Sequence, residues 1–321
     1  MSKKKVGIIR GGPSHEHEVS LNTAENVLKN LPDHYEPYDI FIAKNGDWYL
    51  NNQFAYPEKV ARSVDVVFNA VHGQYGEDGS LQQVLDTFGV PYTGSGQTAS
   101  LVGMNKFISK KAFESAGLFT PRAITVDSSE DPAEAALRVY KKMGPQLVVK
   151  PNSSGSSVGV SVVDNLHDLA RAISDASRYD SKILIEEYIK GKEATVGVID
   201  NFRNKRYYAL PVIEIIPPSS SSFFDIEAKY SGEAKEMVPA NFPIPLKRQL
   251  EELAIKSHNA IGARHYSRTD FIITPKGKIY VLETNTLPGF TKDSLMPKAL
   301  DAVGVSYSEF LDHLIKLALK R

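Results

Sequence analysis

Apolar runs alternate with helix-spaced segments over roughly the first third of the chain, and this alternation constrains the fold most. Residues 5–9 form a short apolar run before two glycines, which is typical of a buried strand. Residues 20–31 have helical spacing, with Ser20 as the expected N-cap. Residues 38–42 and 64–69 are two further expected strands. This order predicts an α/β fold with a parallel, doubly wound sheet, in which ligands bind in the loops after the strands.

The remaining two thirds of the chain also mix strands with helices. The expected strands lie at residues 146–151, 158–163, 182–189, 193–199 and 207–216. The expected helices lie at residues 106–116, 166–177, 246–261 and 307–319. A length of 321 residues is enough for two or three domains with cores of their own.

Composition excludes several classes of function. The 38 basic residues balance the 38 acidic ones, which argues against bulk electrostatic binding to nucleic acid or anionic lipid. The absence of cysteine excludes disulfides, zinc–thiolate sites and a thiol nucleophile. No apolar run is long enough for a signal sequence or a membrane span, so we expect a cytoplasmic protein without a membrane partner.

A hairpin near the C-terminus carries a possible metal site. Residues 267–285 predict two strands joined by a Thr-Pro-Lys-Gly turn. Asp270, Glu283 and Asn285 are oxygen donors of the kind that suits Mg²⁺ sharing its shell with phosphates. Arg268 lies two residues before Asp270, on the same face, where phosphoryl transfer needs a cation. Taken alone, the hairpin fits a solvated surface turn at least as well.

Two other segments have the chemistry of a nucleotide site. Lys150 ends an apolar strand and precedes a Ser/Gly loop at residues 152–157, whose backbone N–H groups are able to surround a phosphate. Glu186 and Glu187 end another strand, where acids often meet ribose hydroxyls. A flexible connection and a polar strand end explain these segments equally simply. Neither a Walker A loop nor a dinucleotide fingerprint occurs in the chain.

With these residues in view, the chain resembles the D-alanine–D-alanine ligases of the ATP-grasp superfamily nearly from end to end. The resemblance rests on short blocks whose order and spacing are specific in combination. The blocks are Gly11-Gly12-Pro13-Ser14, Glu18-Val19-Ser20, His72-Gly73, Gly76-Glu77-Asp78-Gly79, Pro91-Tyr92-Thr93-Gly94-Ser95-Gly96, Lys150-Pro151, Gly155-Ser156-Ser157-Val158-Gly159, Glu227-Ala228-Lys229-Tyr230, Arg268-Thr269-Asp270, Leu282-Glu283-Thr284-Asn285 and Pro288-Gly289.

The resemblance implies an α/β, three-domain ATP-grasp fold. Residues 1–96 would form an N-terminal domain with a Rossmann-like parallel sheet, and residues 97–190 the central ATP-grasp subdomain. Residues 191–321 would form the C-terminal subdomain, with a mobile loop at about 217–235. ATP would lie between the last two.

The activity that the resemblance implies is the ATP-dependent joining of two D-alanines for peptidoglycan precursor synthesis. The reaction would pass through an acylphosphate, with two Mg²⁺ ions (or Mn²⁺) as cofactors, in a cytoplasmic homodimer without a nucleic-acid partner. Tyr230 favours an amine over a hydroxyl as the second nucleophile. The alternatives are a ligase that uses D-serine or D-lactate second, and a non-catalytic ATP-binding protein.

The resemblance also assigns a role to individual residues. Those implied to bind ATP are Lys106, Lys150, Ser157, Glu186, Glu187, Ile189, Glu193 and Lys229. Those implied to bind metal are Asp270, Glu283 and Asn285. Those implied to bind D-alanine are Glu16, His72, Arg268, Ser294 and Leu295. Those implied to be catalytic are Glu16, Ser156, Tyr230, Arg268 and Gly289. The chain departs from common family residues at Phe224, Leu287 and residues 219–222.

Overall fold

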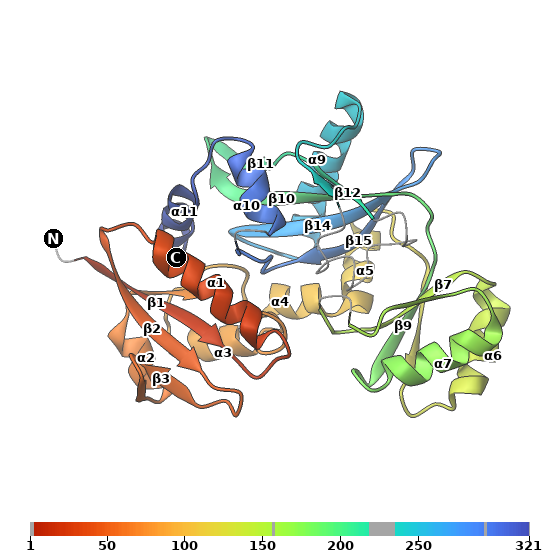
Figure 1. Cartoon of the computed structure of the whole chain (residues 1–321), viewed down its shortest axis with the longest axis horizontal. Coiled ribbons are helices and arrows are strands. Elements are labelled where there is room, and N and C mark those ends of the chain that lie inside the picture. The colour runs from red at the N-terminus through yellow and green to blue at the C-terminus, as the bar shows by residue number, and fades with distance from the viewer. Residues whose placement is uncertain (1–2, 156–157, 218–234, 292–293, 321) are drawn as a thin grey trace.

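Three separate β-sheets organise the described part of the protein (Figure 1). The computed structural model describes residues 3–155, 158–217, 235–291 and 294–320. Each sheet lies within one of the three segments expected from the sequence, and the exact domain boundaries stay a prediction. No helix in the described residues combines the length and the apolar character needed to cross a bilayer.

The N-terminal sheet has a parallel centre and an antiparallel edge. Strand β1 (Lys4–Gly11) pairs in parallel with β2 (Tyr35–Ile42) on one side and with β5 (Val66–Asn69) on the other. The strands β3 (Trp48–Leu50) and β4 (Gln53–Phe54) extend the sheet beyond β2 in antiparallel pairs. The expected parallel pairing is confirmed for the three central strands, whereas the antiparallel edge was not expected.

Helices cover both faces of this sheet, as expected for a doubly wound arrangement (Figure 1). One face packs against α1 (His17–Asn30) and the C-terminal helix α11 (Tyr307–Leu319). The other face packs against α2 (Pro57–Ser63) and α3 (Ser80–Thr87). The end of the chain therefore returns to the first domain and joins it to the last.

The expectation that Ser20 caps the first helix is wrong. Helix α1 begins at His17, with Glu16 at the N-cap position. Ser20 is buried inside the helix, where its hydroxyl donates to the carbonyl of Glu16 at 3.1 Å and accepts from the backbone N–H of His72 at 2.9 Å. The serine connects the loops that follow two neighbouring strands, which is a tertiary role that sequence spacing does not reveal.

The central sheet is antiparallel, with strand order β6-β9-β7-β8. Its strands are β6 (Ala123–Asp127), β7 (Leu147–Pro151), β8 (Ser161–Val163) and β9 (Lys182–Glu187). The helices α6 (Pro132–Met143) and α7 (Leu166–Ala176) supply the apolar side chains packed against it. Sequence reasoning missed β6 and α6, and it began β8 three residues too early.

The C-terminal sheet is also antiparallel and holds the predicted hairpin. Its strands are β10 (Lys192–Phe202), β11 (Lys205–Ala209), β12 (Ile213–Ile216), β13 (Lys235–Met237), β14 (Tyr266–Ile273) and β15 (Ile279–Asn285). Packed on or beside it are α4 (Gln97–Met104), α5 (Lys106–Ser115), α9 (Ile244–Ala260) and α10 (Leu295–Asp301). The single β-rich run expected at residues 207–216 is divided between β11 and β12.

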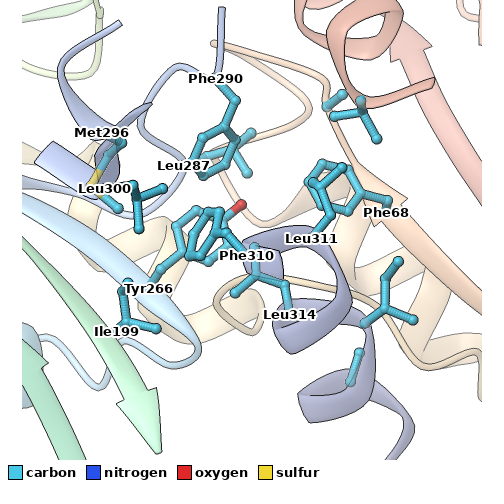
Figure 2. Packing of buried hydrophobic residues seen from close by; sticks show 14 of the residues in the cluster. Phe68, Ile199, Tyr266, Leu287, Phe290, Met296, Leu300, Phe310, Leu311 and Leu314 are labelled. Atoms are coloured by element: carbon cyan, nitrogen blue, oxygen red, sulfur yellow. The ribbon is translucent and has the colours of Figure 1, made fainter. Parts of the chain in front are cut away.

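An aromatic core joins the N-terminal sheet to the C-terminal one (Figure 2). The ring of Phe290 lies 5.1 Å from that of Tyr266 in β14, 5.4 Å from that of Phe310 in α11 and 6.5 Å from that of Phe68 in β5. Leu287 is buried in the same cluster, so an apolar residue at this departure from the family pattern fits its surroundings. This core fixes the loop after β15 relative to the N-terminal domain.

Candidate active site

Four predicted site residues share one face of the β14–β15 hairpin. Asp270 pairs across the strands with Glu283, and Arg268 pairs with Asn285. A bulge between the Asp270–Glu283 pair and the next pair, Phe271–Val281, makes Leu282 an extra residue in β15. Every second residue of β15 before the bulge is buried, and in a regular strand Glu283 would be the next buried position. The extra residue shifts this alternation by one, so that Glu283 and Asn285 lie on the open face. The spacing of two in the sequence predicted the shared face but not the bulge.

Arg268 and Asp270 form a bidentate ion pair on this face. Nε of Arg268 donates to Oδ1 of Asp270 at 3.0 Å, and Nη2 donates to Oδ2 at 2.9 Å. Burial lowers the pKa of Arg268, but the carboxylates of Asp270, Glu283 and Glu77 outweigh it and raise the pKa above its ordinary value. The hydroxyl of Thr195, in β10, also donates to Oδ1 of Asp270, at 2.5 Å.

The predicted metal ligands offer a donor set that fits Mg²⁺. Asp270 and Glu283 supply carboxylate oxygens from facing positions, and Asn285 supplies an amide oxygen that already accepts the N–H of Leu287 at 2.8 Å. Carboxylate and amide oxygens have more than one lone pair, so these bonds leave room for a metal ion. Among the described residues, no group of three or more His, Asp or Glu side chains forms a metal site, and the donor set here is two carboxylates and an amide.

Lys106 connects the hairpin to the central domain. It begins α5, and its Nζ lies 3.8 Å from Oε2 of Glu283 while donating to the carbonyl of Ser154 at 2.6 Å. The side chain of Asn152 accepts the backbone N–H of Phe107 at 2.9 Å, which ties the start of α5 to the loop after β7. Lys106, which is predicted to bind phosphate, thus lies between the predicted metal ligand Glu283 and the Ser/Gly loop.

A buried carboxylate, that of Glu186, forms ion pairs with two more lysines. Oε1 of Glu186 lies 2.6 Å from Nζ of Lys110, and Oε2 lies 2.7 Å from Nζ of Lys150. Burial raises the pKa of Glu186, but the two ammonium groups outweigh it, so the pKa lies below its ordinary value. Lys110 was missed in the sequence, although it lies one helical turn after Lys106 on the face that also buries Phe113.

The neighbouring acid, Glu187, has different surroundings. It faces the opposite side of β9 from Glu186, and its carboxylate pairs with the exposed side chain of Arg122 at 2.9 Å. Ile189 is half-buried just after β9, and Glu193 is half-buried in β10. The remaining predicted ATP and loop residues, at positions 156, 157, 229 and 230, lie outside the described residues, as do Phe224 and residues 219–222.

Glu16 meets loops from two domains. A Cβ built on Gly73 would lie 2.6 Å from Oε2 of Glu16, and one built on Gly155 would lie 3.2 Å from the same atom. Gly73 also has a φ of +72°, a left-handed conformation that favours glycine. The loop after β1 therefore lies beside the Ser/Gly loop after β7, which brings Glu16 next to the segment predicted to surround a phosphate.

His72 is fixed by partners at both ring nitrogens. Nε2 lies 3.0 Å from the hydroxyl of Thr23, and Nδ1 lies 3.3 Å from Oε1 of Glu77. Glu77 also accepts the backbone N–H of Gly73 at 2.8 Å and contributes to the charge around Arg268. Sequence reasoning assigned no role to Glu77, although the acid stands inside one of the blocks that carried the resemblance.

The loop after β15 holds the last predicted residues. A Cβ on Gly289 would lie 3.0 Å from Oγ of Ser294, so this serine lies directly against the glycine backbone. Leu295 begins α10 and packs against the aromatic core. The carbonyl of Phe290 accepts from Asn26 in α1 at 2.7 Å, which anchors the loop to the N-terminal domain.

Loss of the Thr195 hydroxyl is expected to lower the free energy of unfolding. Thr195 is fully buried, so a Thr195→Val variant keeps the shape of the side chain but leaves Asp270 short of one donor. Hydrogen bonds to charged groups contribute about 1.5–3 kcal/mol, and we expect a loss of that size in urea unfolding. Thr195→Ser retains the hydroxyl and is the matched control. Equal losses in both variants would contradict the role of the hydroxyl.

Comparison with protein families gives matches over most of the chain. The model described as D-ala D-ala ligase N-terminus matches residues 5–61 and 53–95. The model described as D-ala D-ala ligase C-terminus matches residues 112–316. D-alanine–D-alanine ligases from Syntrophobacter fumaroxidans and Geotalea uraniireducens are each 39% identical, and the matches cover 99% of this chain and 98% and 96% of theirs.

Solved structures agree with these matches. The D-alanine–D-alanine ligase of Bacillus anthracis, solved in complex with ATP, has a TM-score of 0.82 at 33% identity and covers 99% of this chain and 98% of its own. A D-Ala:D-Ser ligase from Enterococcus faecalis has a TM-score of 0.86 at 30% identity, covering 98% of this chain and 99% of its own. D-alanyl-alanine synthetase A from Vibrio cholerae has a TM-score of 0.88 at 28% identity over the whole of both chains. The chain therefore belongs to the D-alanine–D-alanine ligase family and has its ATP-grasp fold.

Proposed function

We propose that this protein joins two D-alanine molecules into D-alanyl-D-alanine and converts ATP to ADP and phosphate. One observation carries the proposal. The hairpin face with Arg268, Asp270, Glu283 and Asn285 lies next to a row of buried lysines that begins at Lys106. Metal ligands, phosphate-binding cations and a cation for a developing oxyanion are the groups that this chemistry needs.

ATP is proposed to lie between the central and C-terminal sheets. Lys106 and Lys150 would hold its phosphates, together with Ser157 and Lys229, and Glu193 would meet the ribose. The adenine would contact the end of β9, through Glu186, Glu187 and Ile189. Because Glu186 and Glu187 face opposite sides of β9, we propose that Glu187 contributes through its backbone. Two Mg²⁺ ions held by Asp270, Glu283 and Asn285 would offset the phosphate charge when bound.

The first step activates a carboxylate. Glu16 would hold the ammonium of the first D-alanine beside His72, with the carboxylate directed at the phosphates. A carboxylate oxygen attacks the γ-phosphorus, the bond to the β,γ-bridging oxygen breaks, and ADP leaves. The product is an acylphosphate, whose phosphate is a far better leaving group than the original oxide.

The second step forms the peptide bond. Ser294 and Leu295 would hold the carboxylate of the second D-alanine. Its amine, once deprotonated, attacks the carbonyl carbon of the acylphosphate and produces a tetrahedral oxyanion. Arg268 and the N–H of Gly289 would stabilise that oxyanion before phosphate leaves. Glu16, Ser156 and Tyr230 are proposed to hold the loop over the site and exclude water from the acylphosphate.

D-Serine is the principal competing second substrate, because one structural relative is a D-Ala:D-Ser ligase. Product identity by mass spectrometry tests the proposal directly. With ATP, Mg²⁺ and D-alanine, we expect D-alanyl-D-alanine and an equal amount of ADP. An equimolar mixture of D-alanine, D-serine and D-lactate is expected to give the same main product. A main product containing D-serine or D-lactate would refute the proposed specificity, and the absence of any ADP would favour a non-catalytic ATP-binding protein.

We also propose a cytoplasmic homodimer, since ATP is supplied inside the cell and the resemblance is to a dimeric family. Light scattering after gel filtration gives the molar mass in solution. A mass of twice 35.4 kDa supports the dimer, and a mass equal to one chain refutes it.

A further inference from the structure

Three buried charges lie together behind the proposed phosphate site. The carboxylate of Glu186 bridges the ammonium groups of Lys110 and Lys150, at 2.6 Å and 2.7 Å. The exposed fractions of the side chains are 3% for Lys110, 4% for Glu186 and 10% for Lys150. Glu186 and Lys150 already have proposed contacts with ATP, whereas Lys110 has none.

Lys110 is closed off from the site that Lys150 faces. Besides Glu186, its ammonium donates to the hydroxyl of Thr120 at 2.7 Å, and hardly any of the side chain is exposed. Lys150 is the last residue but one of β7, close to the Ser/Gly loop, and its side chain has the larger exposed fraction. Within the described part of the chain, Glu186 is the ion-pair partner that the structure gives Lys150. Lys110 therefore has no direct access to a ligand, and Glu186 connects it to Lys150.

The three groups leave one positive charge uncompensated. A single carboxylate serves two ammonium groups, and charge in a buried environment is costly unless an opposite charge offsets it. Burial, followed by repulsion from Lys150, lowers the pKa of Lys110 despite the attraction of Glu186 and the smaller attraction of Glu114. If Lys110 were neutral, Glu186 would fully neutralise Lys150. An anion bound at Lys150 would compensate the extra positive charge that Lys110 adds to the group.

We propose that Lys110 is a positioning residue for the ATP phosphates, acting through the carboxylate that it shares with Lys150. Lys110 pairs with one carboxylate oxygen of Glu186 and so holds that carboxylate in place. Because the negative charge is shared between two lysines, Lys150 keeps positive charge that is available to a phosphate. The inference deepens the proposed function and rests on ATP being the substrate. It assigns the binding energy of the phosphates partly to a side chain that does not touch them.

A Lys110→Met variant tests the inference through binding rather than turnover. We expect the dissociation constants of the non-hydrolysable ATP analogue AMP-PNP and of inorganic tripolyphosphate, both with Mg²⁺, to rise about tenfold by calorimetry, a loss of about 1.4 kcal/mol. KM for ATP should rise similarly, with KM for D-alanine unchanged. Lys111→Met is the matched control, because Lys111 is exposed on the same helix and pairs with Glu114. It should change neither constant.

A double variant separates positioning from a merely structural role. Lys110→Met with Glu186→Gln restores an unshared charge on Lys150, so tripolyphosphate, which has no adenine, should bind more tightly than to Lys110→Met alone. A structural role predicts the reverse, because the second substitution adds damage to the first. Wild-type affinities in Lys110→Met, or weaker tripolyphosphate binding in the double variant, would overturn the inference. Since the calorimetric binding measurements use no amino acid, their results stand apart from whether D-alanyl-D-alanine is formed.

Discussion

Replacing Arg268 with alanine is expected to lower kcat at least about a hundredfold, the loss typical of removing one oxyanion donor. The guanidinium is held by two bonds to Asp270 on the hairpin face that carries the proposed metal ligands. That placement suits a fixed positive charge beside a developing oxyanion, whereas the proposed adenine site is at the end of β9, in the central sheet. The dissociation constant of AMP-PNP should therefore stay within about threefold of the wild-type value, while single-turnover peptide formation falls.

The same change also removes a buried cation from among acids. Asp270, Glu283 and Glu77 lose a common counter-charge, so the variant should unfold at a lower temperature as well. Arg268→Lys is the matched control, because it keeps the charge but loses the two-pronged geometry. Relative to Arg268→Ala, the unfolding temperature of Arg268→Lys should recover more than its turnover does. Unchanged turnover in folded Arg268→Ala would refute the assigned role, and a parallel recovery of both properties would assign the loss to folding alone.

Sequence reasoning succeeded where one strand supplied the pattern. Glu283 and Asn285 are two residues apart, and so are Arg268 and Asp270, so each pair was expected on one face. The bulge at Leu282 brings the pair from β15 onto the same face of the hairpin as the pair from β14. A bulge is a property of strand pairing, and the local sequence of one strand does not specify it.

Partners that lie far apart in the chain were not predictable in this way. Lys110, Lys150 and Glu186 come from a helix and two strands, and only the fold brings each lysine within 3 Å of the glutamate. Ser20 failed as an N-cap for a related reason, because its hydroxyl bonds to His72 from a different loop. Local propensity describes a residue's own segment, whereas these polar groups are satisfied by tertiary contacts.

Neutralising Glu186 is expected to cost about 3–5 kcal/mol of unfolding free energy, the range for breaking a buried ion pair from one side. A Glu186→Gln variant keeps the shape of the side chain but removes the carboxylate that Lys110 and Lys150 share. Urea unfolding at neutral pH measures the loss. Glu187→Gln is the control on the same strand, because its partner Arg122 is exposed and such pairs contribute only about 0–1 kcal/mol. Equal losses in the two variants would contradict the importance of the buried group.

The pH dependence of that loss identifies its source. The pKa of Glu186 in the folded protein lies below the ordinary value of 4.5, so its charge stabilises the fold fully above that pH. This contribution disappears only as the pH falls through the lowered pKa, where the carboxylate gains a proton. The gap between wild type and Glu186→Gln should therefore be constant from neutral pH down to about 4.5 and narrow under more acidic conditions. A gap that stays constant into strong acid would mean that the glutamine disturbs packing, because a packing defect does not titrate.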